Sequence, residues 1–260
     1  EAYALGRHLA SMVALSASLS QSNSMILLYT DFGRQGPYVG QMHTVLNARA
    51  PGISVIDLMH DAPAFKPTAA GRLLAALAQH FPPQSVCVAV IDPGVGSTRR
   101  PVAVQADGHW FVGPDNGLFE YLGSSKELPR WFEITWQPDE MSNSFHGRDL
   151  FAPVGAALAT NKADRFLRPL EAPSVQAKNL AEIIYIDGYG NAMTGLDADA
   201  INPEQCLCTA GESLHFARTF SDVEPGHAFW TQNSLGLIEI AVNQGSAASQ
   251  LNLEIGSPVS

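Results

Sequence analysis

The fold is decided by three apolar runs: MILLY at Met25–Tyr29, ISVIDLM at Ile53–Met59 and SVCVAVI at Ser85–Ile91. Each run has the length of a β-strand, and the two intervals between them show helical apolar spacing, at Tyr38–Arg49 and at Thr68–His80. We expect Thr68 to cap the second helix. This alternation of strands and helices predicts an α/β fold whose mostly parallel sheet has helices on both faces.

The C-terminal part of the chain has a different pattern. Residues 161–180 mix Pro, Lys and Asn with weak periodicity, which indicates a domain boundary. We therefore expect an α/β domain at residues 25–170 and a smaller, β-barrel-like domain at residues 171–260. The second domain is predicted from four short strands separated by turns: Glu182–Ile186, Leu214–Arg218, Ala228–Gln232 and Leu237–Val242.

Residues 1–24 precede the first strand and differ from the rest of the chain. Arg7 and His8 are followed by a stretch rich in Ala, Ser and Leu, and then by a serine-rich end. This order is similar to the remnant of a secretion signal, but serines dilute its apolar part. We favour an N-terminal extension and a cytoplasmic location, whereas a signal remnant would imply export.

Charge and cysteine content exclude several classes of protein. The chain of 260 residues carries 15 Lys and Arg against 25 Asp and Glu, a formal net charge of −10, and has no basic cluster with which to bind nucleic acid. No apolar run reaches the roughly 18 residues of a membrane span. Cys87, Cys206 and Cys208 are too few for a disulfide framework or a four-ligand zinc site. Because no metal-binding motif occurs either, we expect no bound metal.

Polar turns follow each of the three apolar runs. Asp31 comes directly after the first strand, His60 after the second and Asp92 after the third. In open α/β sheets, ligands bind beyond the carboxyl ends of the strands. We therefore expect Asp31, His60 and Asp92 to gather along one edge of the sheet.

The turn DPGVGSTRR at Asp92–Arg100 is the most informative of the three. Its Pro and two Gly place Asp92 at a strand tip, and Arg99 can fold back toward it. An arginine keeps a neighbouring aspartate ionised and oriented, which suits the positioning of a proton or a water molecule. A structural ion pair that braces the loop explains the same residues equally well.

A second candidate is SFHGRD at Ser144–Asp149. His146 stands just before a helix expected at Arg148–Thr160, whose first turn carries Asp149. A histidine in this position can act as an acid or a base near neutral pH. Capping or packing is the commoner role of a single histidine, so both interpretations stay open.

A third candidate is IDGYGN at Ile186–Asn191, between two expected strands. Asp187, Tyr189 and Asn191 surround two glycines and are suited to recognise an adenine or an amino group. A hairpin turn uses the same residue types, and the stretch by itself favours that plainer interpretation.

The order and spacing of these motifs resemble those of the S-adenosyl-L-methionine (SAM) hydroxide adenosyltransferases. These adenosine-forming SAM hydrolases are relatives of the SAM-dependent fluorinases and chlorinases. Each motif is weak alone, but together they are specific, and the resemblance spans Met25 to Glu254. The motifs are Thr30–Gly33, Gly36–Met42, Ile91–Gly96 with Arg99 and Arg100, Gly113–Leu118, Phe145–Pro153 and Ile186–Asn191.

The resemblance implies an enzyme that hydrolyses SAM, its substrate, to adenosine and methionine without a separate cofactor. It implies a water-activating set of Asp92, Arg99 and His146, and leaves open whether Asp92 or His146 takes the proton. It also implies a homotrimer, with each site between the N-terminal domain of one subunit and the C-terminal domain of a neighbour.

Further residues match the positions that hold SAM in this family. Ser234 is followed by Leu235 where the halogenases have an arginine, which leaves the partner of the methionine carboxylate open. The implied contacts are Asp31 with the ribose hydroxyls, Asp187 with the methionine ammonium, Asn191 with the adenine edge, Tyr189 and Phe65 with the faces of the nucleoside, and Ser234 with the methionine carboxylate.

Three other functions are alternatives to SAM hydrolysis. A SAM-dependent halogenase is disfavoured because Asp92 and His146 form an acid–base pair that the halogenating branch lacks. A metal-dependent nucleoside hydrolase needs clustered carboxylates at one strand end, and Asp92 has no adjacent acidic residue. A non-catalytic module would bind SAM without turnover.

Overall fold

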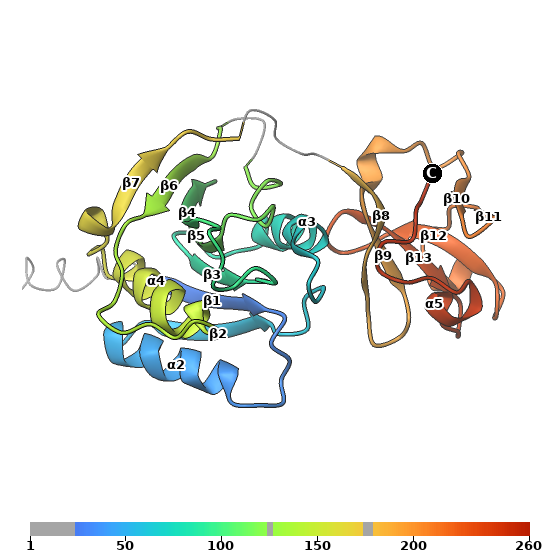
Figure 1. Ribbon diagram of the computed structural model, residues 1–260. Helices are drawn as coiled ribbons and strands as arrows, with labels where there is room; N and C mark the ends of the chain where they lie inside the picture. Colours follow the sequence, from blue (N-terminus) through green and yellow to red (C-terminus); the bar gives the residue numbers. More distant parts are fainter. Residues whose placement is uncertain (1–23, 124–126, 174–178) are drawn as a thin grey trace, which may run out of the picture.

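The computed structural model describes residues 24–123, 127–173 and 179–260. Figure 1 shows a larger α/β unit followed along the chain by a smaller β unit. The expected N-terminal extension, apart from Ser24, lies outside the described residues. None of the described helices is long and apolar enough to cross a membrane.

The larger unit is built on one seven-stranded sheet with the order β2-β1-β3-β5-β4-β6-β7. The strands β2, β1, β3 and β5 are parallel neighbours, as the alternation of strand and helix predicts. Five of the seven strands run in one direction, and β4 and β7 run in the opposite direction. The strands are β1 (Met25–Thr30), β2 (Ser54–Met59), β3 (Val86–Val90), β4 (Pro101–Ala106), β5 (His109–Pro114), β6 (Arg130–Ile134) and β7 (Leu167–Leu170).

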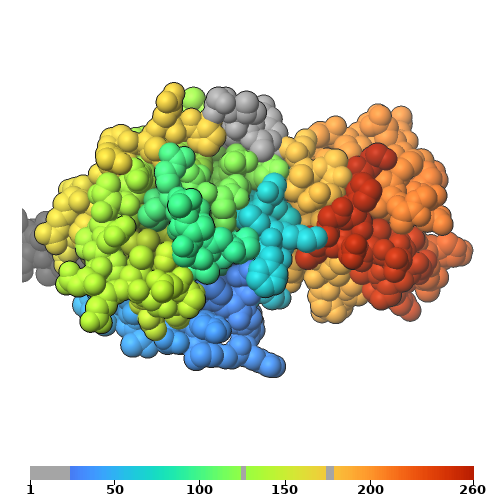
Figure 2. Space-filling view, viewed as in Figure 1, coloured from blue at the N-terminus to red at the C-terminus, as the bar shows by residue number. Residues whose placement is uncertain are grey.

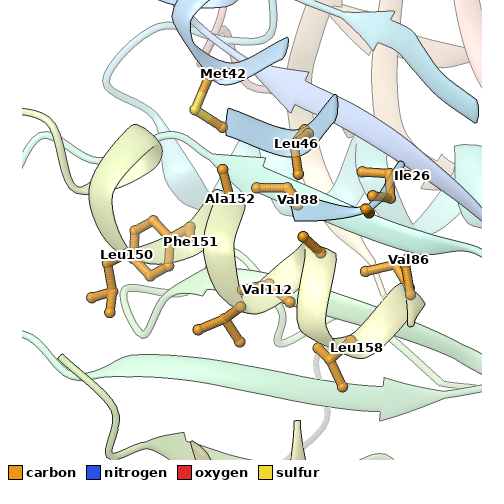
Figure 3. Close-up of a cluster of buried hydrophobic side chains, with 14 of the residues drawn as sticks. Ile26, Met42, Leu46, Val86, Val88, Val112, Leu150, Phe151, Ala152 and Leu158 are labelled. Atoms are coloured by element: carbon orange, nitrogen blue, oxygen red, sulfur yellow. The ribbon is translucent and has the colours of Figure 1, made fainter. Parts of the chain in front are cut away.

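Helices cover both faces of this sheet, because side chains of its central strands alternate between two apolar cores. From β1, Ile26 and Leu28 pack with α2 (Tyr38–Arg49) and α4 (Ala152–Ala159), as Figure 3 shows for Ile26. Leu27 and Tyr29 face the opposite side, where α3 (Pro67–Ala78) covers them.

The start of α3 differs from the expectation. The helix begins at Pro67, its N-cap residue is Lys66, and no side chain caps it, so the predicted capping role of Thr68 is wrong. Proline at the first helical position needs no partner for an N–H group and has its φ already set for the helix. With Pro67 as its first residue, the helix has its N-cap two residues earlier than the sequence pattern indicates.

The last helix of the larger unit has an irregular first turn. Gly147–Phe151 forms a π-helical turn that continues directly into α4, and it begins one residue before the helix expected at Arg148–Thr160. Single π turns in α-helices occur frequently at functional sites. His146 is the residue that immediately precedes this turn.

The smaller unit is a four-stranded antiparallel sheet with the order β12-β13-β9-β8 and a separate two-stranded ribbon. The strand expected at Leu214–Arg218 is wrong beyond Leu214, because the chain there makes only an isolated bridge from Phe216 to Trp230. The predicted barrel-like closure stays a prediction. The elements are β8 (Leu180–Ile186), β9 (Ala192–Asp197), β10 (Leu207–Thr209), β11 (Glu212–Leu214), β12 (Ala228–Gln232), β13 (Leu237–Val242), α5 (Ala247–Gln250) and the 3-10 turns Ala198–Ala200 and Phe220–Asp222; a further 3-10 turn, Asp164–Phe166, precedes β7 in the larger unit.

The two units meet along α3, which lies at the junction in the space-filling view (Figure 2). Leu73 of α3 shares an apolar cluster with Ile184 of β8. Beside them the buried Arg72 donates to the Gly195 carbonyl over 2.9 Å and to the Asp197 carboxylate over 2.5 Å. One helix thus packs on both sheets.

Candidate active site

A pocket of about 460 Å³ opens at the carboxyl ends of β1 and β3. Asp31 directly follows β1, Asp92 lies two residues after the end of β3, and His146 immediately precedes the π-helical turn. We call this the strand-edge pocket. Its lining residues are Asp31, Phe32, Tyr38, Phe65, Val90, Asp92, Val95, Ser144, Phe145, His146 and Gly147.

Arg99 joins the two titratable groups at the back of this pocket. Its Nε donates to both carboxylate oxygens of Asp92 over 2.9 Å, and its Nη2 also contacts Asp92. The same Nη2 lies 2.9 Å from Nδ1 of His146. The Arg99 and Asp92 side chains are 9% and 5% exposed, so water screens this ion pair little.

The arginine also decides how the His146 ring is protonated. A guanidinium group only donates, so Nδ1 of His146 has to accept, and the proton of the neutral ring is on Nε2. Burial lowers the pKa of His146 and the charge of Arg99 lowers it further, against smaller opposing effects of Asp92 and Asp149. His146 is therefore a neutral N–H donor near pH 7.

Asp31 lies on the pocket wall with Asp92, as expected. Burial raises the pKa of the Asp31 carboxyl, and the nearby Asp92 raises it too, while the backbone N–H of Phe65 donates to Oδ2 over 3.2 Å and lowers it. Phe65 has a φ of 59°, in the left-handed region where a non-glycine backbone is strained. Its ring lines the pocket, and the residue is 76% exposed.

His60 lies at the same edge of the sheet, as expected, but its side chain does not line the pocket. The residue is 2% exposed, and its Nδ1 lies 2.8 Å from the hydroxyl of Thr30. The end of β2 is close to Asp31, but the histidine lies behind the pocket wall and not on it.

Three aromatic rings, each within a sequence motif but without an expected role, form a wall of the pocket. Phe32, Tyr38 and Phe145 contact one another with ring centroids 5.3 to 5.9 Å apart. Tyr38 begins α2 and is half exposed. The available signal was the position of Phe32 and Phe145 directly beside two candidate site residues, Asp31 and His146.

A second pocket, which we call the β8–β9 pocket, lies on the smaller unit. Its cavity of about 630 Å³ is lined by Asp187, Tyr189 and Asn191 together with Phe220, Val242, Gln244 and Gly245. Asp187 accepts from the backbone N–H groups of Tyr189 and Asn191 and from Asn191 Nδ2, each over about 3 Å. The stretch is therefore a carboxylate-braced hairpin turn that also lines a cavity.

The strand-edge pocket and the β8–β9 pocket have no lining residue in common. Within one chain, the structure thus brings together Asp31, Phe65, Asp92, Arg99 and His146 at one place. It brings Asp187, Tyr189 and Asn191 together at another.

Ser234 belongs to neither group. It lies in the β12–β13 turn and lines a separate apolar pocket with Leu58 and Leu77, among others. Ile240 of β13 pairs with Ala192, next to the Asp187 turn, while Leu237, next to the turn that carries Ser234, pairs with Asp197 across an irregularity in the register. The implied contact of Ser234 with the methionine carboxylate stays a prediction.

Among the residues that the structure describes, no three His, Cys, Asp or Glu side chains are placed to hold a metal ion together. Cys87 is buried, and burial raises the pKa of its thiol well above the ordinary value. This cysteine therefore behaves as a core residue, as the apolar strand around it predicts.

Comparison with known proteins places the chain in a family. A model of the SAM hydroxide adenosyltransferase N-terminal domain matches residues 26–166, and a model of the C-terminal domain of the same family matches residues 181–260. The chain belongs to the SAM hydroxide adenosyltransferase family.

Relatives of this family member match its sequence or its fold over nearly the full length of both chains. An (R)-S-adenosyl-L-methionine hydrolase of Thermus thermophilus is 36% identical over 90% of this chain and 98% of the relative. A crystal structure of a conserved protein from Thermotoga maritima matches with a TM-score of 0.80 and 28% identity, over 91% of this chain and 99% of that one. A fluorinase of Actinopolyspora mzabensis is 23% identical over 92% of this chain and 97% of its own.

We expect His146 to titrate below the ordinary histidine pKa of 6.5, because burial and Arg99 both oppose its protonation. Long-range ¹H–¹⁵N spectra of the ¹⁵N-labelled protein should show a neutral ring at pH 7 with the proton on Nε2. In an Arg99→Met variant the midpoint should rise toward 6.5, since the opposing charge is gone. A wild-type midpoint above 6.5, or a proton on Nδ1 at pH 7, would contradict this assignment.

Proposed function

We propose that this family member hydrolyses SAM to adenosine and L-methionine by attack of a water molecule at C5′ of the nucleoside. The observation that carries the proposal is the Arg99 guanidinium, which holds the Asp92 carboxylate and the neutral His146 ring beside one pocket. The names of the curated relatives support the same reaction.

The chemistry needs little more than a well-placed water molecule. The sulfonium of SAM makes neutral methionine a good leaving group, so C5′ requires only an in-line nucleophile. As the new C–O bond forms, the attacking water becomes strongly acidic, and a weakly basic carboxylate suffices to take its proton. Because Nδ1 of His146 already accepts from Arg99, Asp92 is the group left to accept that proton.

The rest of the strand-edge pocket suits a nucleoside. Asp31 offers carboxylate oxygens to vicinal ribose hydroxyls, which are hydrogen-bond donors. Phe65 and Tyr38 present aromatic faces at the mouth of the pocket, where they can contact apolar parts of the substrate. Positioning water and C5′ in line supplies a large part of the rate acceleration.

A second copy of the chain completes the site in this proposal. Asp187, Tyr189 and Asn191 line a pocket of their own, and they would meet the strand-edge pocket of a neighbouring subunit in a homotrimer. Asp187 would then face the methionine ammonium and Asn191 the adenine edge. The contact of Ser234 with the methionine carboxylate, which the family resemblance implies, stays a prediction.

Two alternative enzymes fit the pocket less well. A halide ion has no proton to give to Asp92, whereas a water molecule can donate to a carboxylate and be oriented by it. A metal-dependent nucleoside hydrolase would need a cluster of ligands, and the described residues provide none.

Incubation of the purified protein with SAM should give adenosine and methionine in equal amounts, measured by liquid chromatography. Excess chelator and added chloride or fluoride should leave the products unchanged. The relatives' names specify the (R) epimer at sulfur, and we expect faster turnover of that epimer when each is supplied alone. A halogenated nucleoside as product, or no turnover of either epimer, would refute the proposal.

In the same assay, Asp92→Asn keeps the shape of the side chain but removes its proton-accepting charge. We expect kcat to fall roughly 10²- to 10⁴-fold, the usual contribution of proton transfer, while SAM still binds. The matched control is Asp115→Asn, since Asp115 forms the neighbouring ion pair with Arg100, outside the pocket. That variant should keep kcat within roughly 3-fold of the wild type, because an exposed ion pair contributes little.

Mixing two inactive variants tests whether neighbouring subunits share each site. Asp92→Asn and Asp187→Ala should each be nearly inactive alone, and co-expression should restore about a quarter of wild-type activity, because a random trimer forms that share of intact sites. A chain that carries both substitutions, expressed in the same way, gives the baseline activity. If the mixture is no more active than its parts, each chain contains its own complete site.

A further inference from the structure

A chain of polar contacts runs from the surface of α2 to the turn that carries Asp31. Nε2 of His43 lies 2.6 Å from Oδ1 of Asp57, and Nε2 of His60 lies 3.1 Å from the same oxygen in a bent contact. On its other side, Nδ1 of His60 lies 2.8 Å from Oγ1 of Thr30. That hydroxyl oxygen in turn accepts from the backbone N–H of Phe32 over 3.3 Å.

The direction of each hydrogen in this chain follows from the carboxylate. Partial burial raises the pKa of Asp57, but the hydrogen bonds from His60 and His43 outweigh it and lower this pKa, so Asp57 is ionised and only accepts. Nε2 of His60 faces this acceptor and carries a proton, and Nδ1 accepts the proton of the Thr30 hydroxyl. The lone pairs of that hydroxyl remain free for the Phe32 N–H.

These contacts fix the turn on which Asp31 stands. Besides the side-chain bond, the Gly33 N–H donates to the His60 carbonyl over 2.7 Å, and the Ala62 N–H donates to the Thr30 carbonyl over 3.2 Å. Thr30 and His60 are 0% and 2% exposed, so neither can exchange its partner for water. The Asp31 turn is thus fixed by the buried contact between Thr30 and His60 on one side, and the Asp31 carboxylate faces the pocket on the other.

We propose that His60 is a positioning residue that sets the Asp31 carboxylate, through Thr30, for two hydrogen bonds with a ribose. The inference rests on the proposed function, in which Asp31 binds the ribose hydroxyls. His60 does not line the pocket and touches no substrate. Its role is to keep the turn from rotating, because two simultaneous hydrogen bonds tolerate a displacement of only about 0.5 Å.

The test compares how well the full-length protein distinguishes adenosine from 2′,3′-dideoxyadenosine, with both dissociation constants measured by calorimetry. The wild type should prefer adenosine roughly 10- to 100-fold, as expected for hydrogen bonds to a carboxylate. His60→Leu should reduce this ratio to within about 3-fold of unity, because the turn loses its anchor. His60→Asn should keep most of the ratio, since its amide can accept from Thr30 where Nδ1 does.

Two controls separate positioning from general damage to the fold. His109→Leu replaces another buried histidine, at the start of β5 and outside the pocket, and should leave the ratio unchanged. If His60→Leu does not fold, Thr30→Val removes the same hydrogen bond with little change in shape and should reduce the ratio, while Thr30→Ser should restore it.

The outcomes distinguish the two proposals. A wild-type ratio near unity overturns the ribose role of Asp31 and with it the role of His60, whereas absence of SAM hydrolysis overturns the proposed function alone. If the wild type discriminates and folded His60→Leu and Thr30→Val discriminate equally well, His60 is not a positioning residue.

Discussion

One guanidinium group, that of Arg99, determines the chemistry of the site. It binds the Asp92 carboxylate with Nε and reaches His146 with Nη2, and both partners are almost fully buried. A cation beside a buried carboxylate compensates the cost of removing the negative charge from water. Because Arg99 compensates Asp92 and blocks Nδ1 of His146, the pocket holds one proton acceptor and one N–H donor at the same pH.

The sheet makes that interaction possible. Asp92 follows β3 and Asp31 follows the adjacent parallel strand β1, so both carboxylates emerge at the same edge. His146 comes from much later in the chain, and the π-helical turn that follows it packs against the same face of the sheet as α2. The positions of Asp31 and of its turn depend further on contacts made behind the pocket wall, at the end of β2.

Local patterns in the sequence are sufficient to predict much of this arrangement. The alternation of Met25–Ile91 predicts the parallel strands, the two-sided core and the meeting of Asp31 with Asp92, because each depends on strand direction alone. The same strand directions predict that His60 lies at this edge, but they do not predict that its side chain is buried behind the pocket wall. The place of Ser234 beside a separate apolar pocket depends on tertiary packing, which the sequence pattern does not show. The aromatic wall of Phe32, Tyr38 and Phe145 needed contacts between distant segments.

The most direct test of attack by water is a single turnover in H₂¹⁸O with enzyme in excess over SAM. Attack by a water molecule that Asp92 orients predicts one ¹⁸O atom in the 5′-hydroxyl of adenosine and none in methionine, as measured by mass spectrometry. If Asp92 instead attacked C5′ itself, hydrolysis of the resulting ester would leave an unlabelled carboxylate oxygen in the first molecule of adenosine. Unlabelled adenosine from a single turnover would therefore contradict direct attack by water.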